Sequence, residues 1–422
     1  MTNLNQLRSK ALSSGFLHVF GANLFSYFVA FSGSIIYVRL LGQHEYGIYA
    51  FTYNIISFFL LVNGFGAASG VLQFVSKAPD KLTQYAYLKA SMILGILFNI
   101  LLSIIIFCYA IFINLPIPGA RTILIAMAFF PIGRLFIDVF QAYLRATSQN
   151  KILARFAISS NLTLLISSII GIYYFQLIGF ILFTYIAYFI IIILTLVWFN
   201  FPNILKIKVT NLNYSEFIRY SMYVTTGNAF SQLLFVLDVL LLGYVVKDVI
   251  LVAEYKVATI IPFTLSFIPN IICNFFYPNF ARNIQNPCYI INLKNRLRKC
   301  MLVLSISISL SLIILAKPII WIIYGKAYLN SVIPFQILSF GFWVAASFRT
   351  VNGSILASLG HAKFSMWFNV FMLILNLIIS YELIKVYGIV GAAVGVVIIF
   401  SISSIVSTLV LNKLLNRTST KN

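Results

Sequence analysis

Charged residues inside long apolar stretches are the groups of this sequence that could take part in chemistry. One stretch reads Phe-Phe-Pro-Ile-Gly-Arg-Leu-Phe-Ile-Asp and places Arg134 and Asp138 four residues apart, where they can pair on one helix face. Arg349 lies in a second stretch, with no Asp or Glu within four residues of it, and Asp238 lies in a third. Charge in such surroundings is costly, so each residue is a candidate for binding an anion or carrying a cation.

Each of these residues also has a purely structural interpretation, which the sequence leaves open. Arg134 and Asp138 could neutralise each other as a structural pair. The side chain of Arg349 could extend to the membrane interface, or its charge could meet Asp138 at similar depth or an anionic substrate. Asp238 could be buried and hydrogen-bonded by Ser, Asn or Gln neighbours such as Asn228 and Gln232.

No pattern typical of an enzyme or a metal site occurs in the chain. The sequence has no GxxxxGKS phosphate loop, no HExxH and no GxSxG. Its three histidines are scattered among different helices and connections, and its four cysteines form no CxxC pair. We therefore expect a protein that is not an enzyme, with no catalytic residues, no metal and no cofactor.

The composition indicates which elements hold the candidate charges. Of the 422 residues, 61% are hydrophobic and 9% are charged, whereas a soluble domain is nearer 45–50% apolar and about 25% charged. We therefore expect an all-α polytopic membrane protein with twelve transmembrane helices. The apolar runs that predict them are residues 16–38, 48–75, 90–113, 122–144, 156–175, 178–199, 221–245, 250–276, 301–323, 332–356, 364–384 and 388–411.

The distribution of Lys and Arg predicts the orientation of these helices. With the N-terminus in the cytoplasm, 20 of the 29 Lys and Arg residues fall in cytoplasmic segments and 7 in outer segments or helix ends. Positive charge accumulates on the cytoplasmic side of membrane proteins, so both termini are predicted to be cytoplasmic. The net charge of +21 is then explained by topology, and we expect no nucleic-acid partner.

Weak internal repeats divide the chain into two halves. Leu88–Met92 matches Leu297–Met301 at an offset of 209 residues, and other weak matches have similar offsets. An offset near half the chain predicts two six-helix lobes with the same orientation in the membrane. We expect an N-terminal lobe at residues 1–200, a cytoplasmic linker at 201–220 and a C-terminal lobe at 221–422.

Three parts of the sequence resemble bacterial polysaccharide flippases of the Wzx type. Residues 37–50, Tyr-Val-Arg-Leu-Leu-Gly-Gln-His-Glu-Tyr-Gly-Ile-Tyr-Ala, fit that family's R-x-LG-x-x-x-(F/Y)-G-x-Y pattern. Leu237–Gly243 followed by Glu254–Ala258 resembles the same pattern, and Ile355–Lys363 resembles the family's small-Gly-x-x-Lys turn. The resemblance covers nearly the whole chain. It extends to the superfamily of multidrug/oligosaccharidyl-lipid/polysaccharide exporters, which includes the MATE antiporters.

The resemblance implies a MATE-like V of two lobes in the bacterial inner membrane. The substrate would be an undecaprenyl-pyrophosphate-linked oligosaccharide, such as an O-antigen or other surface-polysaccharide repeat unit, moved from the inner to the outer leaflet. Arg349 and Arg134 would bind its pyrophosphate, and Asp138 and Asp238 would carry a coupling ion or pair with an arginine. Membrane lipids, a polysaccharide polymerase and a chain-length regulator are the expected partners.

Two secondary site candidates and two alternative functions also follow from the sequence. Arg39 lies within the resembling motif, and His18 lies near the inner end of the first predicted helix. A multidrug antiporter of the same superfamily, coupled to H⁺ or Na⁺, would favour an acidic cavity over one with two deep arginines. A membrane-embedded polysaccharide polymerase or ligase would need a sizeable outer loop, whereas the predicted outer loops are short.

Overall fold

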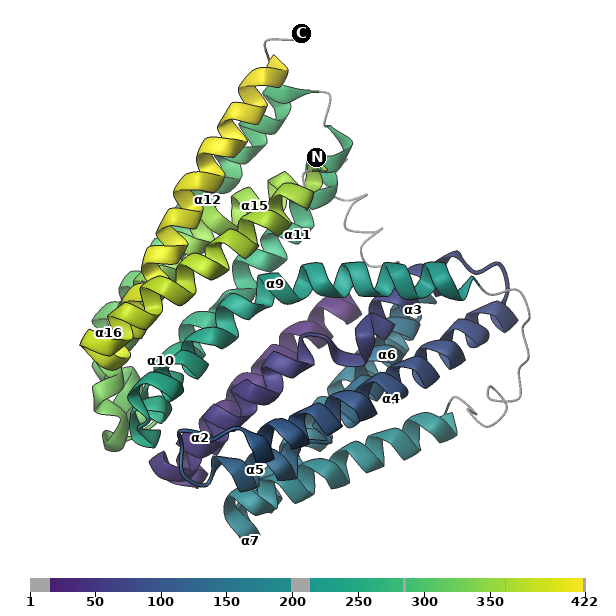
Figure 1. Cartoon of the computed structure of the whole chain (residues 1–422). Helices are drawn as coiled ribbons and strands as arrows, with labels where there is room; N and C mark the ends of the chain where they lie inside the picture. Colours follow the sequence, from purple (N-terminus) through teal and green to yellow (C-terminus); the bar gives the residue numbers. More distant parts are fainter. Residues whose placement is uncertain (1–15, 199–212, 284–285, 361, 420–422) are drawn as a thin grey trace. The chain divides into compact units, whose positions relative to one another are not determined.

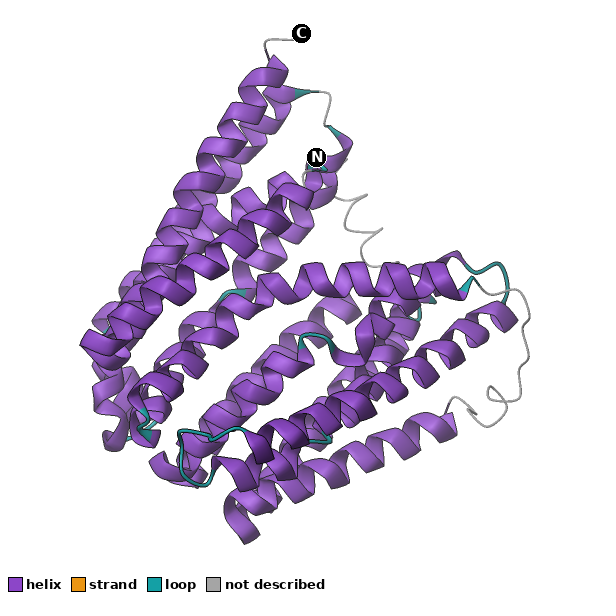
Figure 2. Cartoon of the chain, in the orientation of Figure 1, coloured by secondary structure: helices purple, strands orange, loops and turns teal. Residues whose placement is uncertain are grey.

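The computed structural model describes residues 16–198, 213–283, 286–360 and 362–419, and the secondary structure within these ranges is helical throughout (Figure 2). The chain divides into two compact units, Met1–Ala229 and Phe230–Asn422. Residues 201–212 of the expected linker lie outside the described residues, and the helix that follows begins at Tyr214. The expected pair of six-helix lobes stays a prediction.

The first unit consists of long apolar helices, coloured purple to teal in Figure 1. They are α2 (Phe16–Leu60), the 3₁₀ turn η1 (Asn63–Gly66), α3 (Ala67–Lys77), α4 (Lys81–Phe112), α5 (Ala120–Met127), α6 (Phe130–Ala146), α7 (Asn150–Trp198) and the first part of α9 (Tyr214–Val246). Two of them are about twice as long as one bilayer crossing requires, and both contain a break. The break in α2 is at Gly42, where φ is 72°, and that in α7 is at Gln176, where φ is 54°.

The second unit contains the rest of α9 and the helices that follow it. They are α10 (Val249–Leu265), α11 (Phe267–Arg282), α12 (Pro287–Ile314), α13 (Ala316–Ile323), the 3₁₀ turn η2 (Lys326–Ser331), α14 (Val332–Val344), the π-helical turn η3 (Ala345–Arg349), α15 (Thr350–Ser358) and α16 (Ala362–Ser419). The longest, α16, breaks at Gly388. Its φ of 57° is a left-handed conformation that glycine adopts without the clash a Cβ atom would cause.

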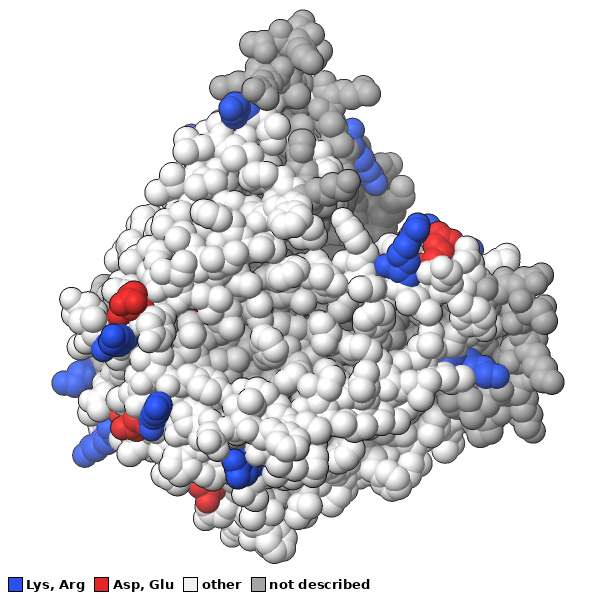
Figure 3. Space-filling view, in the orientation of Figure 1, with Lys and Arg blue, Asp and Glu red and all other residues white. Residues whose placement is uncertain are grey.

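The apolar helices are those of a multi-pass membrane protein. Among the described residues, seven helical segments are long and apolar enough to cross a membrane, or eight if α5 and α6, which are bent by 43°, form one crossing. On the face of the molecule drawn in Figure 3, uncharged side chains cover most of the surface, as a lipid solvent requires. The twelve crossings and the cytoplasmic location of both termini stay predictions.

The predicted helix at residues 301–323 differs from the structure at both ends. The observed α12 begins at Pro287, so the basic segment before residue 301 is helical, and it ends at Ile314. The next helix, α13, has Pro318 in its first turn. A proline at that position lacks an N–H and its ring clashes with the carbonyl four residues earlier, which is that of Ile314. The clash explains why one continuous helix does not form.

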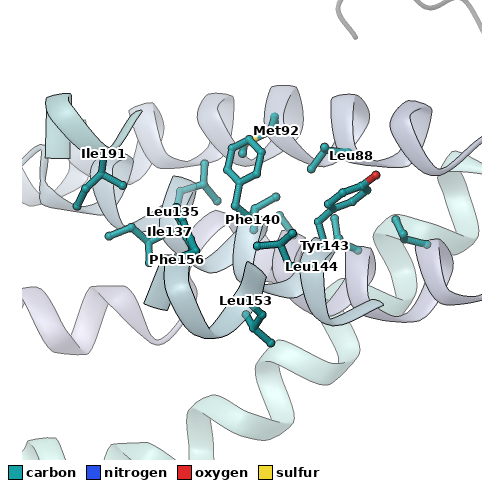
Figure 4. Close-up of a cluster of buried hydrophobic side chains, with 14 residues drawn as sticks. Leu88, Met92, Leu135, Ile137, Phe140, Tyr143, Leu144, Leu153, Phe156 and Ile191 are labelled. Carbon is teal, nitrogen blue, oxygen red and sulfur yellow. The ribbon is translucent and has the colours of Figure 1, made fainter. Parts of the chain in front are cut away.

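A cluster of buried side chains fixes α6 within the first unit (Figure 4). Helix α6 contributes Leu135, Ile137, Phe140, Tyr143 and Leu144, which pack against residues of α3, α4 and α7. In lipid such packing stabilises the association of helices through close van der Waals contact rather than through removal of apolar surface from water. The cluster occupies the apolar face of α6 and leaves the face with Arg134 and Asp138 open.

Candidate functional site

Arg134 and Asp138 form the ion pair that their spacing allows. The Nε atom of Arg134 lies 3.1 Å from Oδ1 and 3.3 Å from Oδ2 of Asp138. The Arg134 side chain is nevertheless 46% exposed and the Asp138 side chain 30% exposed, because the apolar face of α6 packs on the other side. The pair therefore lies where a ligand can reach it, and an anion can compete with the Asp138 carboxylate for the guanidinium.

Two asparagines connect this ion pair to two helix breaks. The Nδ2 atom of Asn63 donates to Oδ2 of Asp138 at 3.0 Å. Asn99, which is fully buried, donates from Nδ2 to Oδ1 of Asn63 at 2.8 Å and to the carbonyl of Pro131 at 2.7 Å. Its Oδ1 accepts from the amide of Gly64 at 2.8 Å. Asn99 thus joins η1 to the start of α6, where Pro131 lies in the first turn.

Aromatic side chains extend from this polar group along α2 and α7. Tyr53 and Tyr188 lie within electrostatic range of the Arg134 guanidinium, and Tyr53 is exposed. The ring of Tyr49 lies 5.4 Å from that of Tyr53 and 4.8 Å from that of Phe180, measured between centroids. Rings with hydroxyl groups can both stack on a sugar face and hydrogen-bond to it. This row of rings therefore adds groups that can bind a sugar to the ion pair, which can bind an anion.

The second unit contains a pocket of about 480 Å³ around Arg349. Its polar lining includes amides and hydroxyls from Ser266, Asn270, Asn274, Tyr277, Asn369, Ser403 and Ser407. Its aromatic lining consists of Phe263, Phe342, Phe364, Phe368, Phe400 and the Tyr277 ring. Among the described residues that line the pocket, Arg349 alone is charged. The pocket can therefore bind an anion that has both polar and apolar parts.

Arg349 is held by the backbone of η3 and by an aromatic ring. It is the last residue of the π-helical turn, whose extra residue rotates the following side chains relative to a continuous α-helix. Its Cζ atom lies 5.1 Å from the centroid of the Phe400 ring. A cation in this position gains about 0.5–2 kcal/mol from the ring, so the guanidinium is held in place beside the pocket.

A helix break forms another wall of the same pocket. Pro262 lies inside α10, which ends at Leu265, and α11 begins at Phe267. Both Pro262 and Ser266, the residue between the two helices, line the pocket. Irregular backbone at membrane depth is tolerated where it lines a polar cavity, which accounts for the break between α10 and α11.

Asp238 is buried in the second unit and does not line this pocket. Its polar neighbour is Asn376 of α16, rather than an Asn or Gln residue of its own helix. The buried hydroxyl of Tyr255 lies within electrostatic range. The carboxylate oxygens have unused hydrogen-bonding capacity, so Asp238 can take up a proton or a small cation at this position.

Of the two secondary candidates, the structure describes the side chain of one. Arg39 is exposed on α2, three residues before the break at Gly42, and the side chain of His18 lies outside the described residues. The expected pairing of Arg349 with Asp138 involves different units and stays a prediction. The asparagines of both sites were not among the residues predicted from the sequence. Asn270 and Asn274 are four residues apart in an apolar run, which places them on one helix face. This spacing could have indicated a polar site in the sequence.

Comparison with known proteins identifies the sequence family and the fold. The family model described as "Polysaccharide biosynthesis protein" matches residues 12–284. No similar protein was found among curated sequences. The structure is similar to an inward-facing multidrug resistance MATE family transporter of the MOP superfamily, with a TM-score of 0.76 and 13% identity over 94% of this chain and 95% of that one.

Two further solved structures have the same fold. The lipid II flippase MurJ, in an inward closed conformation, matches with a TM-score of 0.71 and 17% identity over 95% of this chain and 89% of that one. The Vibrio cholerae MATE transporter VcmN, in its bent form, matches with a TM-score of 0.65 and 15% identity over 97% and 98% of the two chains. The expected superfamily fold is thereby confirmed.

Proposed function

Because the chain belongs to the polysaccharide biosynthesis protein family, whose model matches well over half of it, we propose that it is a lipid-linked oligosaccharide flippase. It moves an undecaprenyl-pyrophosphate-linked oligosaccharide, such as an O-antigen or other surface-polysaccharide repeat unit, from the inner to the outer leaflet of a bacterial inner membrane. Transport proceeds by alternating access. The product is passed to a polysaccharide polymerase that acts with a chain-length regulator.

The Arg349 pocket is the observation that carries this proposal. A planar guanidinium can donate two parallel hydrogen bonds to phosphate oxygens, which a Lys ammonium cannot do. The surrounding amides, such as those of Asn270 and Asn369, match sugar hydroxyls, and the phenyl rings match sugar faces or a prenyl chain. One charge, several amides and several rings in one pocket fit a substrate that is anionic, sugar-bearing and lipid-linked.

The electrostatics of the transport step favour export. A pyrophosphate that leaves the cytoplasm moves along the membrane potential and gains about 2.3 kcal/mol per charge per 100 mV. The potential alone can therefore drive the step, and counter-flow of an ion adds to it. Asp138 and Asp238 are the carboxylates we assign to such an ion, because both lie in apolar helices and one is buried without an ion-pair partner among the described residues.

The second candidate function is a cation-coupled multidrug antiporter. Its support is the fold shared with MATE transporters and the buried carboxylate of Asp238. The two functions differ in the sign of the charge that the substrate carries. The Arg349 pocket favours an anionic substrate, which is why the flippase is our first proposal.

Transport by the purified protein tests the proposal directly. In proteoliposomes we expect a fluorescent polyprenyl-pyrophosphate disaccharide to exchange between leaflets, as measured by its accessibility to a membrane-impermeant quencher. Empty vesicles are the control. Movement of a cationic dye but not of this lipid would favour the antiporter, and polymerisation or transfer of the sugar would contradict the flippase.

Replacing Asp238 with Asn should remove the effect of an ion gradient on transport. The carboxamide keeps the shape of the carboxylate but binds neither H⁺ nor Na⁺ at this site. We expect flipping driven by membrane potential to persist, while stimulation by a pH or sodium gradient is lost. Asp248→Asn is the matched control, because Asp248 is an exposed N-cap residue and Asn caps helices equally well. Gradient stimulation that survives in Asp238→Asn would refute this assignment.

A further inference from the structure

A second cation lies close to the turn that carries Arg349. Arg298 of α12 donates from Nη2 to Oδ1 of Asn352 at 2.8 Å, and its Cζ atom lies 5.6 Å from the centroid of the Phe348 ring. Its Nε atom is buried without a hydrogen-bond partner. No carboxylate within the described ranges forms an ion pair with Arg298. Among the described residues, neutral groups therefore hold this positive charge.

Asn352 connects Arg298 to the wall of the pocket. Asn352 is fully buried, and its Nδ2 atom donates to Oγ of Ser407 at 3.1 Å and to Oγ1 of Thr408 at 2.7 Å. Ser407 lines the Arg349 pocket. The amide is thus used on both sides, with its oxygen toward Arg298 and its nitrogen toward α16. The charge of Arg298 lies one side chain behind the pocket wall.

Helix α12 also holds the π-helical turn itself. The hydroxyls of Ser305 and Ser347 lie 2.8 Å apart, and both side chains are buried. Arg298 stacks on Phe348, the next residue of the turn. The two residues that precede Arg349 are therefore both tied to α12, so this helix sets where the Arg349 side chain leaves the backbone.

A third positive charge raises the cost of this arrangement. Lys294, one turn before Arg298 on α12, is buried and donates from Nζ to Oδ1 of Asn412 at 2.9 Å. It lies close enough to Arg298 for the two like charges to repel each other. Buried charges without counter-charges are costly, and an anion bound in the neighbouring pocket would lower that cost.

We propose that Arg298 is a positioning residue of the Arg349 pocket: it fixes the π-helical turn and adds a positive charge behind the wall, so that the pocket prefers a pyrophosphate to a monophosphate. This inference rests on the proposed function and specifies it. Arg349 contacts the ligand, while Arg298 acts through Phe348 and Asn352. The more negative ligand gains more from the second charge.

Binding of two soluble probes to the full-length protein in nanodiscs tests this role. Farnesyl pyrophosphate and farnesyl monophosphate have the same chain and differ in charge. We expect Arg298→Gln to weaken pyrophosphate binding roughly tenfold and monophosphate binding much less, as the loss of one charge behind a pocket wall predicts. Arg298→Lys should restore most of the preference. Lys299→Gln is the control, because Lys299 is exposed on the same helix and its loss should change neither affinity.

A further variant separates charge from structure. Asn352→Asp keeps the contact with Arg298 but neutralises the charge of Arg298. The hydroxyls of Ser407 and Thr408, which donate to the carbonyl of Ser404, can rotate to donate to the new carboxylate instead. A positioning charge predicts that this variant also loses the preference for pyrophosphate, whereas a purely structural tie predicts no change. The variant gives a result even if Arg298→Gln does not fold.

The outcomes distinguish this inference from the proposed function. Unchanged preference in Asn352→Asp, or equal weakening of both probes in Arg298→Gln, overturns the role of Arg298. If Arg349→Gln binds farnesyl pyrophosphate as the unaltered protein does, the pocket is not the pyrophosphate site and the support for the flippase is lost. If Arg349→Gln loses binding while Arg298→Gln and Asn352→Asp keep the preference for pyrophosphate, the role of Arg298 is refuted but the proposed function is not.

Discussion

Replacing Arg349 with Ala should nearly abolish polysaccharide export, and Arg349→Lys should retain part of it. Arg349 is the one charged residue among the described residues that line the pocket. Hydrogen bonds to charged groups contribute about 1.5–3 kcal/mol each. Losing two of them lowers substrate binding by about two orders of magnitude or more. Lysine keeps the charge but lacks the fork of two donors. Surface polysaccharide, measured alongside the abundance of the protein in the membrane, checks the result.

Controls for Arg349 separate its possible roles. Arg282→Ala removes an exposed arginine at the end of α11 in the same unit and should export normally. If Arg349 acts only by pairing with Asp138, the double variant Arg349→Ala with Asp138→Ala should recover export, because the two uncompensated charges disappear together. Full export by Arg349→Ala alone would leave only the structural interpretation, in which the side chain extends to the interface.

Replacing Asn99 with Leu should lower the thermal stability of the protein by several degrees. Leucine has nearly the same shape, but it leaves the amide of Gly64, Oδ1 of Asn63 and the carbonyl of Pro131 without the hydrogen bonds of Asn99. Each buried group left unsatisfied costs about 1–3 kcal/mol, so we expect a total loss of about 3 kcal/mol. Export should fall as well, because Asn63 also donates to Asp138.

Unfolding in detergent, followed by tryptophan fluorescence or by exposure of the buried thiol of Cys273, measures this effect. Asn228→Leu is the control, since Asn228 is exposed on α9 and its replacement removes no buried hydrogen bond. A melting temperature of Asn99→Leu equal to that of the control would mean that η1 stays packed against the start of α6 without the Asn99 hydrogen bonds.

Features that depend on neighbouring residues in the chain could be predicted from the sequence. The spacing of Arg134 and Asp138 predicted their ion pair, because residues four apart face each other on any α-helix. Pro131 and Pro262 indicate helix breaks from the sequence alone, because proline removes a backbone donor wherever it occurs. Apolar runs predicted helices because lipid leaves the backbone few other ways to satisfy its polar groups.

Features that depend on residues far apart in the chain could not be predicted. Asn99 bonds to a turn 35 residues earlier, and nothing in its own helix indicates that partner. Arg298 belongs to a run of basic residues that is typical of a solvated loop, yet in α12 it is half-buried and donates to Asn352, 54 residues later. The π-helical turn that ends at Arg349 has no sequence pattern of its own, so neither the orientation of Arg349 nor its support from α12 could be inferred.

The charge of the Arg349 pocket has a consequence for inhibitors. A compound that occupies it must complement one guanidinium, several amides and a group of phenyl rings, which describes an anionic amphiphile with a flat polar head. Cationic lipophilic compounds would meet repulsion there. A screen against this protein should therefore begin with phosphonates, sulfonates and carboxylates on hydrophobic scaffolds, and with bisphosphonates first if the second cation adds the selectivity proposed for it.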